Sequence, residues 1–361
     1  MNDESKALLA KYEPKELGVI TADPQVVAAR FSPCGKFVVA GGFDSRVRRW
    51  DLASEGYPEL ASLGGHGGWV EATAFYGDTL FSADTWGKLC AWSYADEKPE
   101  PTWEIENAHD GWIRQLAVSP DGALVASCSR DQRVVIWSTA DGHKLQEFSE
   151  IDDVFCLKFH PGGNDIITGD AKGKVKQRNL ANGQPLREFD ASSLFLLHRL
   201  QDVGGVRVLA FDQEGKTLAV GGTKPKNGGT VQGVPTVLLF DFENGEIRHT
   251  LELGATSDCF VHDIRLHEDG FVMAVTSGTP GTGKIIFQRT EDKEPFYQST
   301  KIANCHSLSL HPDGQRLAVA ATNKGSNGNG RRLTEEGEYT GNHSPIHLFQ
   351  LGGESTEAAA G

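Results

Sequence analysis

One phrase recurs along this chain: an apolar strand, a short turn rich in Pro, Asp and Gly, and a second apolar strand. The seven turns are, in chain order, Ser32–Gly35, Tyr76–Asp78, Ser119–Gly122, His160–Gly163, Asp212–Gly215, His267–Gly270 and His311–Gly314. Internal repeats of this kind are typical of architectures in which each unit buries its apolar faces against its neighbours. The 42 glycines and 15 prolines fit such frequent turns. Long helical periodicity is scarce, so the repeats predict an all-β chain.

Each repeat continues through a loop into a third strand. That strand ends in an aromatic residue in six of the seven repeats, and in Arg178 in the fourth; the six are Trp50, Trp92, Trp137, Phe240, Phe287 and Phe349. Two-residue turns such as Asp141-Gly142 and Asn182-Gly183 then predict a hairpin into a fourth strand. The sequence therefore predicts seven units of four antiparallel strands.

The last repeat lacks a fourth strand, because only Cys305–Leu310, Arg316–Ala321 and Ile346–Leu351 have strand character before the polar tail. Residues 16–20 have the length and character to supply it. Pairing the two ends of the chain would close the ring and protect an otherwise exposed edge. We therefore expect a single domain over residues 16–351, with disordered segments at 1–15 and 352–361.

The third repeat contains the most specific motif. It reads His109–Trp112, then the turn Ser119–Gly122, then Ala126–Asp131, then Val135–Trp137. This pattern resembles the WD-repeat family. The resemblance implies a seven-bladed β-propeller of four-stranded antiparallel blades, closed by the N-terminal strand.

The resemblance also implies one buried hydrogen-bonded chain, made by His109, Ser127, Asp131 and Trp137. Buried polar groups persist when they satisfy one another, so we expect a structural clamp rather than a catalytic triad. The second repeat keeps His66, Ser82 and Trp92, but Trp86 takes the position of Asp131, as Lys172 does in the fourth.

In propellers of this family, the loops between second and third strands and the linkers between blades open on one face, the top face. All four long insertions belong to such segments: Ala191–Gly205, Thr223–Pro235, Ser277–Gly283 and Thr322–Pro345. Loops on either face tolerate lengthening at small entropic cost, so one-sided growth indicates a function. We expect a non-catalytic scaffold that binds a protein or peptide with its top face.

Seven residues of this face are candidate partner-binding residues: Trp69, Trp86, Trp112, Arg114, Arg130, Phe195 and Leu197. Tryptophan and arginine are enriched among residues that dominate binding energy. Tryptophan is equally a core residue in such folds, and the apolar segment around Phe195 and Leu197 can cap its own blade. Both interpretations stay open.

The charge balance restricts the partner. Thirty-five basic and 49 acidic residues give a net charge of −14, which opposes nucleic-acid binding and favours a partner with basic elements. The chain has no apolar run of membrane-spanning length, so we expect no membrane partner and a cytoplasmic location. We also expect the protein to be a monomer. The six isolated cysteines are expected to be small buried hydrophobic residues.

An enzyme is the alternative, since propeller folds also host catalysis. His262 and His306 lie near the starts of inner strands, with Asp263 beside His262. A metal-assisted hydrolase or lactonase at the mouth of the central channel therefore stays open. No metal-binding motif with HxH or HExxH spacing is present. We accordingly expect no catalytic residue, no metal and no cofactor.

Overall fold

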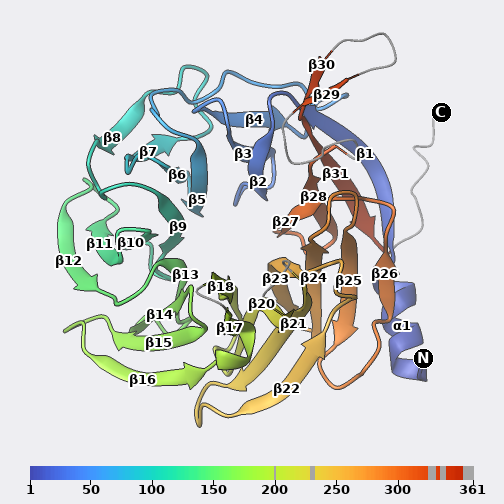
Figure 1. Ribbon diagram of the computed structural model, residues 1–361. Coiled ribbons are helices and arrows are strands. Elements are labelled where there is room, and N and C mark those ends of the chain that lie inside the picture. The colour runs from blue at the N-terminus through green and yellow to red at the C-terminus, as the bar shows by residue number, and fades with distance from the viewer. Residues whose placement is uncertain (199–200, 228–231, 324–330, 334–338, 353–361) are drawn as a thin grey trace.

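A computed structural model of the chain describes residues 1–198, 201–227, 232–323, 331–333 and 339–352. Seven sheets stand like blades around a central channel (Figure 1). Within the described residues, helix is confined to α1 (Asp3–Tyr12) and the single turn η1 (Ser192–Leu194). The predicted all-β, seven-bladed propeller is confirmed.

The strands of the first four blades follow the repeats in order. Blade one contains β2 (Val26–Phe31), β3 (Phe37–Gly42) and β4 (Val47–Asp51). Blade two contains β5 (Val70–Tyr76), β6 (Thr79–Asp84), β7 (Leu89–Ser93) and β8 (Pro101–Ile105). Blade three contains β9 (Ile113–Val118), β10 (Leu124–Ser129), β11 (Arg133–Ser138) and β12 (Lys144–Ser149). Blade four contains β13 (Val154–Phe159), β14 (Asp165–Asp170), β15 (Lys174–Asn179) and β16 (Pro185–Asp190).

The last three blades complete the ring. Blade five contains β19 (Val206–Phe211), β20 (Thr217–Asn227), β21 (Gln232–Asp241) and β22 (Ile247–Glu252). Blade six contains β23 (Phe260–His267), β24 (Phe271–Ser277), β25 (Lys284–Arg289) and β26 (Tyr297–Ser299). Blade seven contains β27 (Cys305–Leu310), β28 (Arg316–Ala321), β31 (Ser344–Leu351) and β1 (Pro14–Ala22).

The N-terminal strand closes the ring, as predicted. β1 pairs antiparallel with β31 along its whole length, from Pro14 opposite Leu351 to Ala22 opposite Ser344. The strand is longer than the predicted segment 16–20, because β31 offers it a complete edge.

The predicted disorder of residues 1–15 is wrong. Residues 3–12 form α1, which is capped by the Asn2 side chain, and residues 14 and 15 already belong to β1. The Tyr12 ring packs 5.1 Å from the Phe271 ring, and its hydroxyl donates a 2.6 Å hydrogen bond to Asp269. Tertiary contacts with blade six therefore order a segment whose charged sequence suggested none. The predicted tail lies outside the described residues from 353 onward.

Blade one departs from the four-stranded pattern. Its described outer segment makes only isolated bridges, Val47 with Leu63 and Trp50 with Glu59. The buried Arg49 guanidinium holds this segment by donating hydrogen bonds of 2.6 and 3.0 Å to the Ala61 carbonyl. A side chain thus replaces part of a strand ladder.

The hydrophobic core is divided among the contacts between blades. Seven clusters of buried apolar side chains lie at the seven interfaces, one between each pair of adjacent blades. Middle strands are covered on both faces, which explains near-continuous apolar runs such as Val38–Ala40. Each blade therefore depends on its neighbours for stability.

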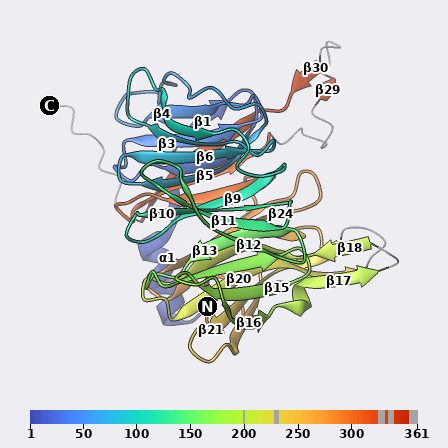
Figure 2. The same ribbon diagram turned by 90° about the vertical axis from the view of Figure 1, so that its left-hand side faces the viewer.

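The insertions have their own structure. Ala191–Gly205 contains η1 and the hairpin β17 (Phe195–His198) and β18 (Gln201–Gly204), and the blade-seven insertion contains β29 (Arg331–Leu333) and β30 (Tyr339–Gly341). Figure 2 shows both hairpins projecting from the same side of the disc. In the insertion Thr223–Pro235, the described residues 223–227 and 232–235 continue the pairing of β20 and β21. No helix in the described ranges is long and apolar enough to cross a membrane.

Candidate functional site

The mouth of the central channel is built from one residue near the start of every innermost strand. In each blade the pairing between the innermost strand and the next shifts at this residue, as in a β-bulge. The seven residues, here called the mouth ring, are Val27, Glu71, Arg114, Phe155, Arg207, His262 and His306. A bulge frees a residue from the ladder and redirects its side chain.

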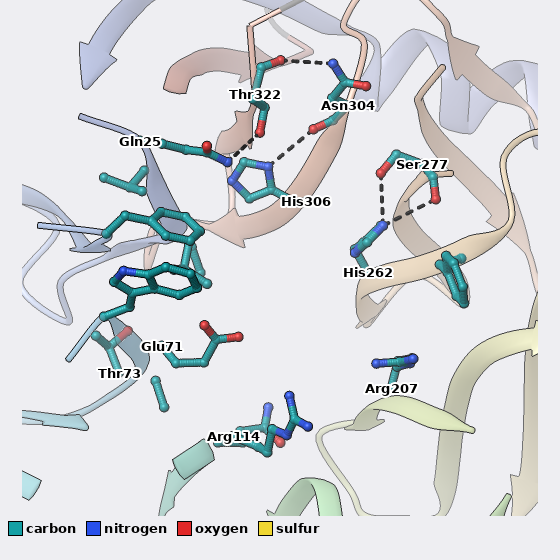
Figure 3. A pocket seen from close by; sticks show the side chains of 18 of the residues that line it. Gln25, Glu71, Thr73, Arg114, Arg207, His262, Ser277, Asn304, His306 and Thr322 are labelled. Atoms are coloured by element: carbon teal, nitrogen blue, oxygen red, sulfur yellow. Dashed lines mark hydrogen bonds between the residues drawn. The ribbon is translucent and has the colours of Figure 1, made fainter. Parts of the chain in front are cut away.

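All seven mouth-ring side chains line one cavity of about 830 Å³, the mouth cavity. Figure 3 shows Glu71, Arg207, His262 and His306 around this opening. Gly278 and Pro280, from one predicted insertion, also line it, as does Thr322 from another. Two of the four insertions therefore reach the channel mouth.

Aromatic rings and guanidinium groups alternate along one side of the mouth. The Arg114 guanidinium lies 3.9 Å from the Trp112 ring and 5.0 Å from the Phe155 ring. The Arg207 guanidinium lies 4.3 Å from the Phe155 ring and 5.5 Å from the Phe260 ring. Such stacking orients a cation while its charge stays available.

The two arginines differ in their charge partners. Arg114 forms a 2.9 Å ion pair with Asp153. Arg207 makes neither an ion pair nor a hydrogen bond with the described part of the chain, and burial lowers its pKa. Arg207 is therefore the mouth-ring cation best placed to meet an external group.

Three tryptophans border a second hollow beside the mouth. Trp69, Trp86 and Trp112 line this space of about 330 Å³, here called the Trp hollow. Trp69 is 48% exposed and Trp86 is 71% exposed, while the Trp112 indole nitrogen is buried without a hydrogen-bond partner in the described structure. Trp69 and Trp112 also line the mouth cavity, so the two spaces are continuous.

Gly67 and Gly68 explain how Trp86 can lie over the preceding loop. A Cβ atom added to Gly67 would lie 2.7 Å from the Trp86 ring, and one added to Gly68 would lie 3.0 Å from it. Contacts this short do not fit a larger residue. The glycine pair thus allows the ring to approach the backbone.

Two titratable groups with shifted pKa values flank the row of aromatic rings and guanidinium groups: Glu71 in blade two, and His262 in blade six (Figure 3). Burial raises the pKa of Glu71 to about 7, although the nearby charge of Arg114 opposes the rise. Burial, with a contribution from His306, lowers the pKa of His262 to about 4. His262 is therefore a neutral imidazole at neutral pH, and it lies 2.9 Å from the Ser277 hydroxyl (Figure 3).

The residues considered for a metal site do not converge. His262 and His306 both line the mouth cavity, but Asp263 forms a 2.8 Å ion pair with Arg30 and accepts a 3.0 Å hydrogen bond from the Leu308 amide. In the portion of the chain that the structure describes, no three His, Cys, Asp or Glu side chains are grouped to hold a metal ion.

The predicted partner-binding residues divide into two groups. Trp69, Trp86, Trp112 and Arg114 lie together at the mouth and the Trp hollow. The other three lie apart: they are Arg130, Phe195 and Leu197, and none lines either space.

Each of these three has a different setting. Arg130 is exposed, and its backbone amide donates to the Trp112 carbonyl at 3.0 Å. Phe195 is half-buried at the base of the β17–β18 hairpin, and Leu197 is 63% exposed on it.

Sequence reasoning missed Glu71, Phe155 and Arg207 as site residues. Their common position was visible in the sequence, because each directly follows the first apolar residue of an innermost strand: Val70, Val154 and Val206. The local pattern does not show, however, that this position forms a bulge.

The predicted clamp residues of blade three lie in one hydrogen-bonded chain. His109 Nε2 lies 2.7 Å from Ser127 Oγ, and its Nδ1 lies 3.0 Å from Asp131. The Trp137 indole donates to Ser127 Oγ at 2.9 Å. Mutually satisfied and largely buried, these groups join the His109 loop and the Asp131 turn to strands β10 and β11.

Blade two contains the same chain with one residue displaced. His66 Nε2 lies 2.7 Å from Ser82 Oγ, and the Trp92 indole donates to that oxygen at 2.8 Å. Asp84, two positions before Trp86, supplies the carboxylate 3.2 Å from His66 Nδ1. Burial opposes ionisation, but the bonds from His66 and from backbone amides lower the pKa of Asp84 to about 2.

The expectation that Trp86 replaces the clamp aspartate is therefore corrected. Asp84 ends β6 and points inward, whereas Trp86 lies at the apex of the turn and points outward. This displacement frees Trp86 for the Trp hollow.

Comparison with known proteins gives the following similarities. The family model described as WD domain, G-beta repeat, matches residues 15–51 and 100–138, which contain blade-one strands and the clamp motif of blade three. The chain is 26% identical over 305 residues to "Telomerase protein component 1" of Rattus norvegicus, covering 83% of this chain and 10% of that protein. It is 24% identical over 186 residues to "Protein groucho" of Drosophila melanogaster, covering 50% of this chain and 25% of that protein.

A third relative is the "Target of rapamycin complex subunit wat1" of Schizosaccharomyces pombe. The identity is 25% over 185 residues, covering 48% of this chain and 57% of that protein. The chain spans about a tenth of the length of the telomerase component. Taken with the two matched repeats and the closed seven-bladed ring, these similarities support a relationship of the chain to the WD-repeat family of β-propellers.

Proposed function

We propose that this protein is a non-catalytic scaffold that binds an extended segment of a protein partner across the channel mouth on its top face. The observation that carries the proposal is the Trp hollow. Trp69 is about half exposed and Trp86 is largely exposed, and the hollow that they form with Trp112 continues into the mouth cavity. Clustered exposed apolar rings mark interaction sites, and buried tryptophans dominate binding energy at interfaces.

The chemistry of the two spaces defines the segment. The Trp hollow suits a large apolar side chain. The Arg207 guanidinium suits an acidic side chain at the mouth, because no described residue forms an ion pair with it. The basic elements expected from the net charge of −14 belong to the parts of the partner that meet the outer surface.

The names of two relatives are consistent with a role in assemblies, since one is a complex subunit and another is a protein component. The enzyme alternative has no comparable support, because the Asp263 carboxylate is already bonded to Arg30 and to the Leu308 amide.

Affinity measurement with selected peptides tests the proposal. Peptides are selected from a random library on the immobilised full chain, and their dissociation constants are measured by fluorescence anisotropy. We expect Trp86→Ala and Trp112→Ala to weaken binding by roughly 30-fold each, as for interface residues that dominate affinity.

Leu145→Ala is the matched control, because Leu145 is 54% exposed on the outer strand β12, away from the mouth. The proposal is wrong if the selected peptides bind both tryptophan variants as tightly as the Leu145 variant. Circular dichroism spectra of all three variants establish that each is folded.

A further inference from the structure

A second set of equivalent positions lies below the mouth ring, three residues further along each innermost strand. These positions, here called the second ring, are Arg30, Ala74, Ala117, Lys158, Ala210, Arg265 and Ser309. Three are cations and none is an acid.

The three cations come from blades that are not neighbours. Arg30 is in blade one, Lys158 in blade four and Arg265 in blade six. The charges of Arg265 and Arg30 nevertheless act on Lys158, whose pKa burial and these charges lower to about 8. Side chains from separated blades can interact in this way only by pointing into the channel, as Arg30 does in pairing with Asp263 of blade six at 2.8 Å.

The charges of this cluster are not balanced. Asp263 is already used, because it pairs with Arg30 and accepts hydrogen bonds from the Leu308 and Ile264 amides. Among the described residues, Lys158 and Arg265 have no hydrogen-bond or ion-pair partner, and Arg265 Nε is buried without one.

Lys158 and Arg265 are half-buried, and like charges held close together without partners repel one another. The net charge of −14 shows that this positive excess is no general feature of the protein. One carboxylate against three cations leaves two positive charges to be met. A bound group with two negative charges would offset this repulsion.

We propose that the channel binds a small tetrahedral dianion of the sulfate or phosphate class at the second ring, held by Lys158 and Arg265 with Arg30 alongside. Lysine offers a point charge and arginine a planar set of donors, a combination suited to such oxyanions. The mouth cavity reaches down to Arg30 and provides the path, and Arg114 and Arg207 attract anions to its mouth. This site does not depend on the proposed protein partner.

Thermal unfolding of the full chain tests the site with inorganic anions alone. The melting temperatures in sulfate, phosphate and chloride are compared at equal ionic strength and about pH 7. We expect sulfate and phosphate to raise Tm with a saturable dependence, because binding to the native state alone stabilises it by mass action. Chloride at the same ionic strength gives only the screening effect. Equal shifts from all three salts would overturn the proposal.

Variants assign the effect to the channel. Lys158→Met and Arg265→Met should abolish the sulfate shift, while Lys36→Met, which changes an exposed turn lysine, should keep it. Lys158→Met should also have a higher Tm than the wild type without sulfate, because it removes an unbalanced charge. A Lys158 variant that keeps the sulfate shift would contradict the site. Should one variant fail to fold, titration calorimetry of the wild type and the other variant decides the question.

The pH dependence provides a further criterion. A lysine with a depressed pKa is charged below about 8 and neutral above it. Sulfate keeps its charge over this range, so raising the pH from about 7 to about 9.5 should weaken its binding by up to roughly 30-fold. The response of Lys36→Met should follow the wild type. A sulfate affinity independent of pH would show that Lys158 does not hold the anion.

No protein partner is present in these anion measurements, so their outcome is independent of the peptide-binding experiment.

Discussion

Asp84 and Asp131 provide the same carboxylate to neighbouring blades from different places in the repeat. Asp131 lies four residues after Ser127, whereas Asp84 lies two residues after Ser82. Both reach the Nδ1 atom of the clamp histidine, at 3.0 Å in blade three and 3.2 Å in blade two. The hydrogen-bonded chain thus constrains the position of an atom rather than the position of a residue in the repeat.

Replacing either aspartate should destabilise the fold without affecting peptide binding directly. Asp84→Ala and Asp131→Ala should each lower the free energy of unfolding by about 1–3 kcal/mol, because backbone amides and a histidine lose their acceptor in a buried place. Urea unfolding followed by tryptophan fluorescence measures the change. Asp110→Ala, at an exposed position beside His109, serves as the control.

The effect of Asp84 also has a pH dependence. Its pKa in the folded state is about 2, below the ordinary value of 3.8, so its stabilisation is present above about pH 4 and is lost as the pH falls toward 2. The difference between wild type and Asp84→Ala should shrink over that interval. A difference that stays constant would mean that the ionised carboxylate is not what stabilises blade two.

The insertions show at the level of elements how one segment can serve both packing and recognition. Leu194, in η1, is fully buried in the interface between blades four and five. Three residues later, Leu197 is 63% exposed on the β17–β18 hairpin. The two interpretations of this apolar segment, capping its own blade or contacting a partner, therefore apply to different residues.

Substitution in the hairpin should separate these roles. Leu194→Ser should lower the free energy of unfolding by about 2–5 kcal/mol, as for other truncations of buried leucine. Leu197→Ser, alone or with Phe195→Ser, should change Tm little and weaken binding of the native partner in a pull-down. Chemical denaturation of each variant provides the comparison. If Leu197→Ser unfolds the protein, the hairpin is structural and contributes no binding surface.

The whole molecule is stabilised by contacts between blades, so its closure determines whether it folds at all. β1 buries Ile20 and Ala22 against blades seven and one and covers the edge of β31. Helix α1 adds the docking of Tyr12 at blade six. An open ring would leave one interface and one strand edge exposed, and exposed edges promote aggregation.

Truncation should therefore act in two steps. Deleting residues 1–12 removes α1 and should lower Tm while leaving a cooperative transition. Deleting residues 1–22 also removes β1 and should abolish cooperative unfolding or give aggregated protein. Differential scanning calorimetry and size-exclusion chromatography distinguish the two outcomes. Similar calorimetric transitions for both deletions would show that β1 is not the closing element.

The sequence by itself determined the repeat architecture, because strand alternation, turn residues and the His109–Trp137 motif are local signals that each blade carries within its own residues. The same signals predicted β1 as the closing strand, since one repeat lacked its outer strand. Trp69, Trp112 and Arg114 were predictable as mouth residues because they lie just before or within innermost strands of recognisable repeats.

Only the tertiary structure decided which residues meet at the channel. α1 is ordered by blade six, and a charged decapeptide carries no local sign of that contact. Glu71 and Arg207 look like ordinary polar positions of a strand until a bulge turns them toward the axis. Arg30, Lys158 and Arg265 are more than a hundred residues apart in sequence, and ring closure alone brings their charges together. Local patterns specify strands and turns, whereas side-chain convergence depends on how separate blades pack around one axis.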